Sequence, residues 1–117
     1  MINRVALLLY YKAPFIKWIN ESDPSTDASP VTAEEANRDK TVYLIDEEEV
    51  EHLDEWIEVN LASLFESELD CWYADESLWP PNRDLELFHQ WFDVQCHTVL
   101  IDAGSRPIVD DQEEGVN

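Results

Sequence analysis

The chain has 117 residues, 44% of them hydrophobic, and its 27 Asp and Glu outnumber 7 Lys and Arg to give a formal net charge of -20. A charge of this size repels other polyanions, which excludes direct binding to nucleic acid and to anionic membrane surfaces as functions. The length fits one domain with its own core, and five Trp, four Tyr and four Phe separate the chain from disordered acidic proteins, which are poor in aromatic residues.

The N-terminal part of the chain predicts a central strand and then a short helix. Residues Val5 to Tyr11 are continuously apolar, which is typical of a strand buried on both faces. An amphipathic helix is predicted over residues 13–21, because Phe15, Trp18 and Ile19 share one helical face and a proline is tolerated in the first turn.

Residues 22–40 are rich in Asp, Ser, Thr, Pro and Ala, and they predict a long, exposed and mobile loop. Within this loop Thr32 and Glu35 have the spacing of a capping box. No large apolar residue follows to dock such a helical turn, so the turn is not expected to be stable.

The same loop partly matches the ligand spacing of an EF-hand calcium loop. The residues with oxygen atoms at the first, third, fifth and twelfth positions are Asp23, Ser25, Asp27 and Glu34. The sixth position requires glycine for a sharp turn but holds Ala28, and Pro30 stiffens the loop further. We therefore expect no calcium site here.

Residues 41–45 are β-branched and aromatic, and they predict the second strand. Asp46 and Glu49 then have the spacing of a capping box, with Ile45 and Val50 as a hydrophobic staple, so a long helix is predicted to begin at this point. Apolar residues three or four positions apart continue the helix as one buried stripe. They are Val50, Leu53, Ile57, Leu61, Leu64, Phe65, Leu69 and Trp72.

The C-terminal third predicts a connector, a helix and a strand. Pro80 and Pro81 make residues 74–83 a rigid, non-helical connector. A helix follows, with Leu85, Phe88 and Phe92 on one face. Residues 96–102 then have a strand pattern, and residues 107–109 predict a short edge strand that completes a hairpin.

These elements give the order β-α-β-α-α-β, with a C-terminal hairpin, and predict an α+β fold in which helices cover one face of a small sheet. We expect a single domain over residues 1–110 and a disordered acidic tail over residues 111–117.

Three segments resemble those of small acidic bacterial proteins that are known only as hypothetical. The segments are Thr41-Val42-Tyr43-Leu44-Ile45, Glu76-Ser77-Leu78-Trp79-Pro80 and Leu85-Glu86-Leu87-Phe88-His89-Gln90-Trp91-Phe92. The resemblance covers about two thirds of the chain. It implies a compact domain and brings no activity with it.

The two cysteines, Cys71 and Cys96, have no secretory context, which favours reduced thiols in a cytoplasmic protein. No CxxC or HxxxH spacing is present, and the neighbours Cys96 and His97 would point to opposite faces of a strand, so neither a metal site nor a cofactor is expected. One alternative function remains open, a small enzyme or ligand-binding domain with a site near Cys71, His89 and His97.

The charge is concentrated between Thr41 and Asn82, where thirteen carboxylates occur without a Lys or Arg. On a regular helix Glu51, Asp54, Glu55 and Glu58 lie on one side, at spacings of about 5 to 6 Å that are similar to the phosphate spacing of DNA. This pattern predicts a surface that binds a basic protein partner, and its most specific form is a nucleic-acid mimic. The alternative is an acidic surface that serves solubility or salt adaptation only.

Aromatic residues beside this acidic helix suggest anchors for the same partner. Trp72, Tyr73 and Trp79 can dock a protein when they lie on the surface, although large aromatic residues near helix ends more often pack into a core. The sequence therefore favours a domain without enzymatic activity, in which carboxylates steer a basic partner and aromatic residues anchor it. A homodimer through this patch or through an exposed sheet edge is a further hypothesis.

Overall fold

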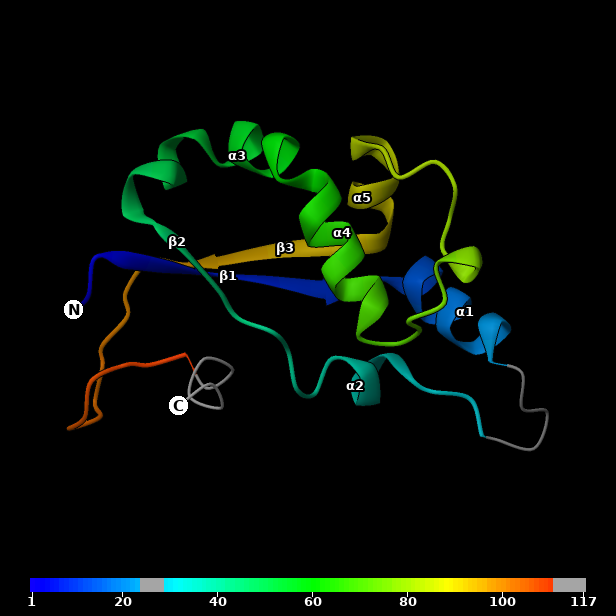
Figure 1. The fold of residues 1–117 in the computed structure, drawn as a ribbon, viewed down its shortest axis with the longest axis horizontal. Helices are drawn as coiled ribbons and strands as arrows, with labels where there is room; N and C mark the ends of the chain where they lie inside the picture. Colours follow the sequence, from blue (N-terminus) through cyan, green and yellow to red (C-terminus); the bar gives the residue numbers. More distant parts are fainter. Residues whose placement is uncertain (24–28, 111–117) are drawn as a thin grey trace.

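The computed structural model describes residues 1–23 and 29–110 of the chain. The predicted α+β class is confirmed: a three-stranded antiparallel sheet in the order β2-β1-β3 is covered by helices (Figure 1). The strands are β1 (Arg4–Tyr11), β2 (Tyr43–Asp46) and β3 (Phe92–His97). The helices are α1 (Ala13–Ser22), α2 (Ala33–Ala36), α3 (Leu53–Val59), α4 (Leu61–Asp70) and α5 (Leu85–Trp91), with two 3-10 helices, η1 (Glu47–His52) and η2 (Glu76–Leu78).

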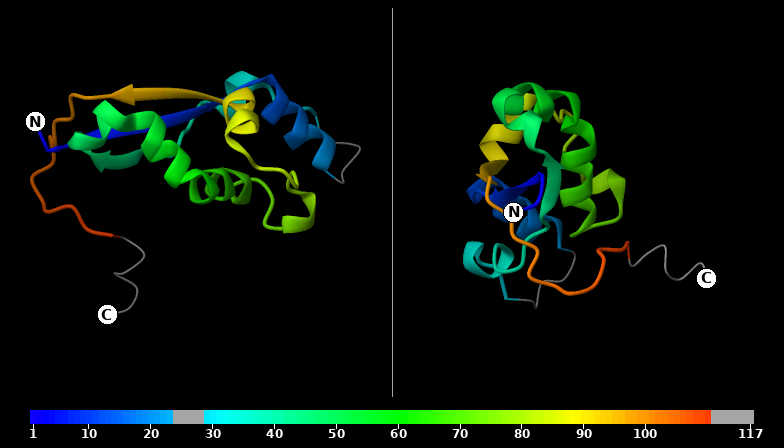
Figure 2. Two further views of the ribbon diagram at one scale, coloured as in Figure 1. Left: turned by 90° about the horizontal axis from the view of Figure 1, so that it is seen from above. Right: turned by 90° about the vertical axis from the view of Figure 1, so that its left-hand side faces the viewer.

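Strand β1 lies in the centre of the sheet, as its continuous apolar sequence predicts, and its register defines two different faces. Leu7 lies opposite Tyr43 of β2 and Cys96 of β3, so these three side chains share the face that the helices cover. The residues between them point to the other face, where Leu8 and Leu44 remain partly or largely exposed. Figure 2 shows α3 and α4 together on one side of the sheet.

The core between sheet and helices is built mainly from aromatic rings. Phe15 of α1 is fully buried and stacks on Tyr11 with a distance of 4.0 Å between ring centroids. Phe92 at the start of β3 contacts Phe65 and Phe88 at centroid distances of 5.3 and 4.9 Å. The predicted inward face of α1 is confirmed, because Phe15, Trp18 and Ile19 are all buried. Edge-on and stacked rings of this kind favour one packing arrangement over others.

The predicted continuous helix over residues 46–72 is wrong, because the segment divides into η1, α3 and α4. The Asp46 side chain makes no cap hydrogen bond, and a 3-10 helix rather than an α-helix follows it. At the second break the Asn60 side-chain amide donates to the carbonyl oxygen of Trp56 over 2.9 Å. A side chain that bonds locally to the backbone in this way competes with regular helix geometry. The apolar stripe is still buried further along, at Ile57 and in α4.

The predicted boundary between the last helix and the last strand is also wrong. Strand β3 begins at Phe92, four residues before the predicted start, and residues 98–110 contain no strand that would complete a hairpin. Phe92 lies opposite Tyr11 in the sheet and is buried there. The sequence Phe-Asp-Val-Gln-Cys-His alternates apolar and polar residues, which is the pattern of a strand with one covered face.

Residues 29–40, the part of the predicted loop that the structure describes before β2, contain the short helix α2. Thr32 and Glu35 form the capping box of α2, in which the Thr32 hydroxyl accepts from the Glu35 N–H over 3.1 Å. Ala36 docks this turn against the core, a role that the sequence did not suggest for so small a residue. The expected calcium-loop residues Ser25 and Asp27 lie outside the described residues.

Asn37 follows α2 and takes the place of a strand beside the end of β1. Its side-chain oxygen accepts from the Tyr11 N–H over 2.8 Å, and its side-chain nitrogen donates to the Tyr11 carbonyl oxygen over 3.2 Å. The amide therefore makes the pair of bonds that an antiparallel neighbour makes in a regular ladder.

We expect Asn37→Ala to lower the free energy of unfolding by about 1–3 kcal/mol, because it leaves a partly buried N–H and C=O of Tyr11 without partners. The measurement is urea denaturation followed by far-ultraviolet circular dichroism. Asn37→Asp is the matched control, since its carboxylate can accept from Tyr11 but cannot donate, and its midpoint should fall between those of the native chain and the alanine variant. Equal midpoints for all three proteins would contradict this role.

Candidate functional site

The four carboxylates predicted to bind a partner lie on η1 and α3 and are all exposed. Glu51 belongs to the 3-10 helix, whereas Asp54, Glu55 and Glu58 belong to α3. In the part of the chain that the structure describes, none of the four forms an ion pair. Their charge is therefore not neutralised within the domain and is directed at the solvent.

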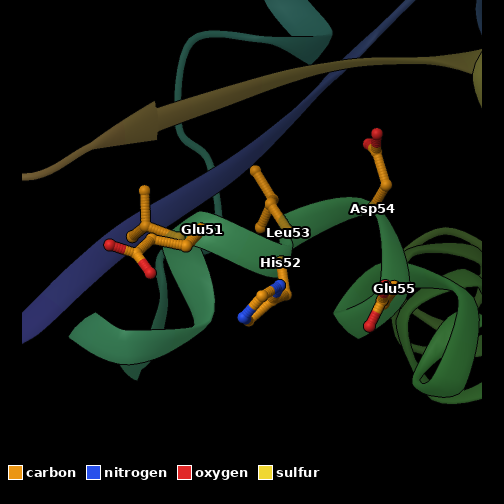
Figure 3. A pocket seen from close by; sticks show the side chains of 6 residues that line it. Glu51, His52, Leu53, Asp54 and Glu55 are labelled. Carbon is orange, nitrogen blue, oxygen red and sulfur yellow. The ribbon is translucent and has the colours of Figure 1, made fainter.

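Two shallow hollows lie next to each other on this acidic segment, with volumes of about 280 and 290 Å³. The first is lined by Val50, Glu51, His52, Leu53, Asp54 and Glu55 (Figure 3). The second is lined by Glu49, His52, Glu55, Trp56, Val59 and Asn60. Because His52 and Glu55 belong to both, the two hollows form one continuous surface, which we call the acidic groove.

The acidic groove also offers apolar contact area. Val59 lines the second hollow of the groove and is 83% exposed, which is unusual for a valine in a helix. Trp56 is half-buried against the core, and its indole N–H has no hydrogen-bond acceptor among residues 1–23 and 29–110. The Trp56 ring and the exposed valine can contact the apolar stem of a long basic side chain, and the neighbouring carboxylates can accept hydrogen bonds from its charged head.

The regular phosphate-like spacing expected for Glu51, Asp54, Glu55 and Glu58 does not apply to the observed segment. The helix type changes from 3-10 to α between His52 and Leu53, so Glu51 does not continue the helical row of the other three. Figure 3 shows that Asp54 and Glu55 project in different directions. Glu51, Asp54 and Glu55 line the acidic groove, whereas Glu58 lines neither hollow, so the four carboxylates do not form a single line.

The three aromatic residues predicted as anchors are half-buried, and each uses its polar atom inside the domain. Trp72 Nε1 donates to the Tyr11 hydroxyl over 3.0 Å, and Trp79 Nε1 donates to the Tyr73 carbonyl oxygen over 2.8 Å. The Tyr73 hydroxyl donates to the carbonyl oxygen of Ile19 over 2.6 Å. These contacts connect the ends of α1 and α4 with the connector before α5, and they leave less of each ring for a partner.

The three residues of the alternative site are not brought together. His97 pairs with Ala6 at one end of β3, whereas His89 lies in α5 before the other end. The strand between them spans about 17 Å at 3.4 Å per residue. Cys71 follows α4, and both cysteines are free thiols. No group of three or more His, Cys, Asp or Glu with the arrangement of a metal site occurs in the described residues.

One buried charged cluster was not predicted from the sequence. Glu68 of α4 is 1% exposed and accepts hydrogen bonds from the hydroxyls of Tyr11, over 2.8 Å, and of Tyr43. The Lys40 side chain is 4% exposed, and its Nζ lies 3.6 Å from Glu68 Oε1 and 3.1 Å from the centroid of the Tyr11 ring. We call Glu68, Lys40, Tyr11 and Tyr43 the Glu68 cluster.

Burial dominates the electrostatics of the Glu68 cluster. It raises the pKa values of the Tyr11 and Tyr43 hydroxyls well above their ordinary value, and the adjacent Glu68 carboxylate raises them further. Burial also lowers the pKa of Lys40, although the negative charge of Glu68 opposes this shift. The nearby Cys71 thiol has a raised pKa for the same reasons, first burial and then Glu68, so it is not activated as a nucleophile.

The Glu68 cluster connects the sheet to α4 and has no free group for chemistry. Both Glu68 oxygens have donors, and no buried side-chain nitrogen or oxygen among the described residues is without a hydrogen-bond partner. A catalytic carboxylate needs access to a substrate, which a side chain enclosed by Tyr11, Tyr43 and Lys40 does not have. We therefore assign a structural role to this cluster.

Comparison of the chain with protein-family models, with curated proteins and with solved structures finds no match. The resemblance to small acidic bacterial proteins stays a prediction, and the function has to be inferred from the residues themselves. None of the helices in the described ranges is long and apolar enough to cross a membrane.

Proposed function

We propose that this domain binds a basic protein partner through the acidic groove on η1 and α3. The observation that carries the proposal is the coincidence of unpaired carboxylates with the two adjoining hollows. Glu51 and Asp54 line the first hollow, and Glu55 is shared with the second, which adds apolar area from Trp56 and Val59. A Lys or Arg of the partner would place its charge among the carboxylates and its apolar stem against Trp56. Long-range attraction from a chain with a net charge of -20 would accelerate the encounter.

The proposal changes the expected anchors. Trp56 and Val59 replace the predicted anchors Trp72, Tyr73 and Trp79 in this role, because the polar atoms of those three side chains are already bonded within the domain. We place the encounter in the cytoplasm, where the two free thiols would remain reduced. No enzymatic role is proposed.

The test compares capture of proteins from a cell lysate by three immobilised chains and elution with a salt gradient. One chain is native, one has Glu51, Asp54, Glu55 and Glu58 changed to the corresponding amides, and one has four exposed carboxylates elsewhere changed in the same way. The control positions are Glu21, Glu34, Glu76 and Glu86. Both variants lose four charges, so they differ only in where the charges are removed.

The expected result is that basic proteins bind the native chain and the control variant but not the groove variant, and that they elute early because salt screens the interaction. DNA-binding proteins among them would support the mimic form of the proposal. If the groove variant captures the same proteins as the native chain, or if none of the chains captures any, the acidic groove is not a binding surface and the charge serves solubility.

A single substitution tests the apolar end of the groove. Val59→Lys introduces a cation where a basic partner would bind, and it is expected to weaken binding about tenfold, a change of roughly 1.4 kcal/mol. Val59→Ala is the control and should weaken binding less. Val59 is largely exposed, so circular dichroism of both variants should match that of the native chain.

A further inference from the structure

The outer edge of β3 is an unpaired strand edge. The order β2-β1-β3 places β3 at the border of the sheet, and no strand pairs with its outer side within the described residues (Figure 2). Natural sheets block such edges with Lys, Pro or a bulge. Strand β3 has neither Lys nor Pro, and its register with β1 continues without interruption from Phe92 to His97.

The hydrogen bonds of β1 determine which backbone groups of β3 face outward. Tyr11 uses both its N–H and its C=O for Asn37, on the side of the strand away from β3. Phe92 lies opposite Tyr11, so its own N–H and C=O point away from β1. The Phe92 N–H already donates to the Phe88 carbonyl oxygen, which leaves the Phe92 C=O at the free edge. This direction alternates along a strand, and Val94 and Cys96 therefore also present their backbone groups outward.

We propose that the occupant of this edge is a second copy of the chain, paired antiparallel through β3 with Gln95 facing Gln95 of the second copy. In this register Val94 lies opposite Cys96 of the second copy, so the residues with outward backbone groups form the hydrogen-bonded pairs. Asp93 lies opposite His97 of the second copy, and the same pair occurs twice by symmetry. Closed two-fold pairing of this kind joins two sheets into one of six strands.

Charge complementarity selects this register and this partner. A shift by two residues in either direction keeps the backbone hydrogen bonds but places Gln95 opposite Asp93 or His97 of the second copy. Only the central register brings Asp93 and His97 together, and both side chains are exposed on the open face of the sheet. The paired strands carry few charges themselves, because Arg4, Asp46 and Asp93 are the only Asp, Glu, Lys or Arg residues in the three strands. The net charge of -20 on each copy opposes the approach at long range, so added salt should strengthen the pairing.

Sedimentation equilibrium of the full chain at physiological ionic strength tests the pairing. The native chain should form dimers as its concentration rises. Asp93→Lys replaces the carboxylate that accepts from His97 by an ammonium group that cannot accept, at both ends of the paired strands, and it should weaken the dimer about tenfold or more. The combined variant Asp93→Lys, His97→Asp restores opposite charges and should regain most of the native affinity. Circular dichroism checks that each exposed substitution leaves the fold unchanged.

Cysteine cross-linking tests the register. In a background of Cys71→Ser and Cys96→Ser, Gln95→Cys places two sulfur atoms in a non-hydrogen-bonded pair, with about 4.5 Å between Cα atoms, which suits a disulfide. His97→Cys is the control, because its two copies would lie about 13 Å apart along the strands, too far for a disulfide. Mild oxidation should link the first variant only. A native chain that is monomeric at all concentrations, an Asp93→Lys variant that dimerises like the native chain, or equal cross-linking at both positions would overturn the proposal.

Discussion

Replacing Lys40 by methionine is expected to lower the free energy of unfolding by about 3 kcal/mol, although methionine fills a similar volume. The Lys40 side chain is 4% exposed, and its Nζ lies 3.6 Å from a Glu68 oxygen. Removal of the ammonium group leaves the Glu68 carboxylate buried without a countercharge, which costs more than the ion pair itself contributes. This loss of stability lies toward the lower end of the range for breaking a buried ion pair, because the hydroxyls of Tyr11 and Tyr43 still donate to Glu68.

A double-mutant cycle separates this charge effect from lost packing. Glu68→Gln alone should also destabilise the protein, because it leaves the Lys40 ammonium buried without its carboxylate. The combined variant Lys40→Met, Glu68→Gln contains neither buried charge, and its loss should be smaller than the sum of the single losses by about 1–3 kcal/mol. Urea denaturation of the four proteins near neutral pH supplies the values. If the losses simply add, Lys40 and Glu68 act independently and the cluster is not a unit.

Local sequence patterns predicted those elements whose apolar side chains lie in the core, although β1 is only partly covered on the face that the sequence also predicted to be buried. The apolar run of β1 and the inward face of α1 are examples, because the side chains that give the pattern, such as Leu7 and Phe15, are also those that the core encloses. The alternation in residues 92–97 was present in the sequence as well. The prediction still assigned Phe92 to the preceding helix, since Phe88 lies four residues earlier and suits one helical face.

Tertiary contacts decided the features that local patterns did not indicate. The apolar stripe from Val50 to Trp72 suits one long helix, but the Asn60 side chain bonds to the Trp56 carbonyl oxygen and the helix divides there. Likewise Asn37, which ends the turn that the capping box at Thr32 begins, bonds to Tyr11, 26 positions away in the sequence. Contacts at such separations cannot be deduced from the spacing of residues along the chain.

The acidic groove and the Glu68 cluster contain the same type of side chain with opposite environments. From composition, Glu68 was one of thirteen carboxylates between Thr41 and Asn82. A local signal did exist: Glu68 lies four residues after Leu64 and directly before Leu69, so it belongs to the buried side of the stripe. By contrast Glu51 and Glu55 lie on the outer side and keep full contact with water. Helical position, more than charge density, therefore separates structural carboxylates from those available to a partner.

Alkaline pH is expected to unfold the domain cooperatively, and the ionisation of Tyr11 and Tyr43 should coincide with unfolding. Both hydroxyls have raised pKa values in the folded state, first through burial and then through Glu68 in its Coulombic and hydrogen-bonding effects. Above the ordinary tyrosine pKa of about 10, the unfolded chain releases these protons whereas the folded chain keeps them. The folded state then binds more protons, so stability falls as pH rises, by about 1.4 kcal/mol per pH unit for each tyrosine.

Other titrating groups also make the stability depend on pH, and their effects differ from those of the two tyrosines in direction or in the pH at which they begin. The lowered pKa of Lys40 makes stability rise with pH below about 10.5, because in that range the unfolded chain binds the additional proton. The raised pKa values of Cys71 and Cys96 act in the same direction as those of the tyrosines, but their effect begins at lower pH. The Tyr73 hydroxyl also has a raised pKa, first through burial and then through Asp23, so it adds to the decline above pH 10, and a variant of the cluster is needed to isolate the contribution of Tyr11 and Tyr43.

Absorbance of tyrosinate and circular dichroism, followed together through an alkaline titration, provide the measurement. Tyr43→Phe is the decisive comparison, because it removes one of the two coupled hydroxyls but keeps the ring beside Glu68. This variant should be less stable at neutral pH, and the slope of its stability above pH 10 should be smaller by about 1.4 kcal/mol per pH unit. If Tyr11 and Tyr43 ionise while the circular dichroism is still native, the hydroxyls are accessible and the Glu68 cluster does not hold the sheet against α4 in the way that its hydrogen bonds indicate.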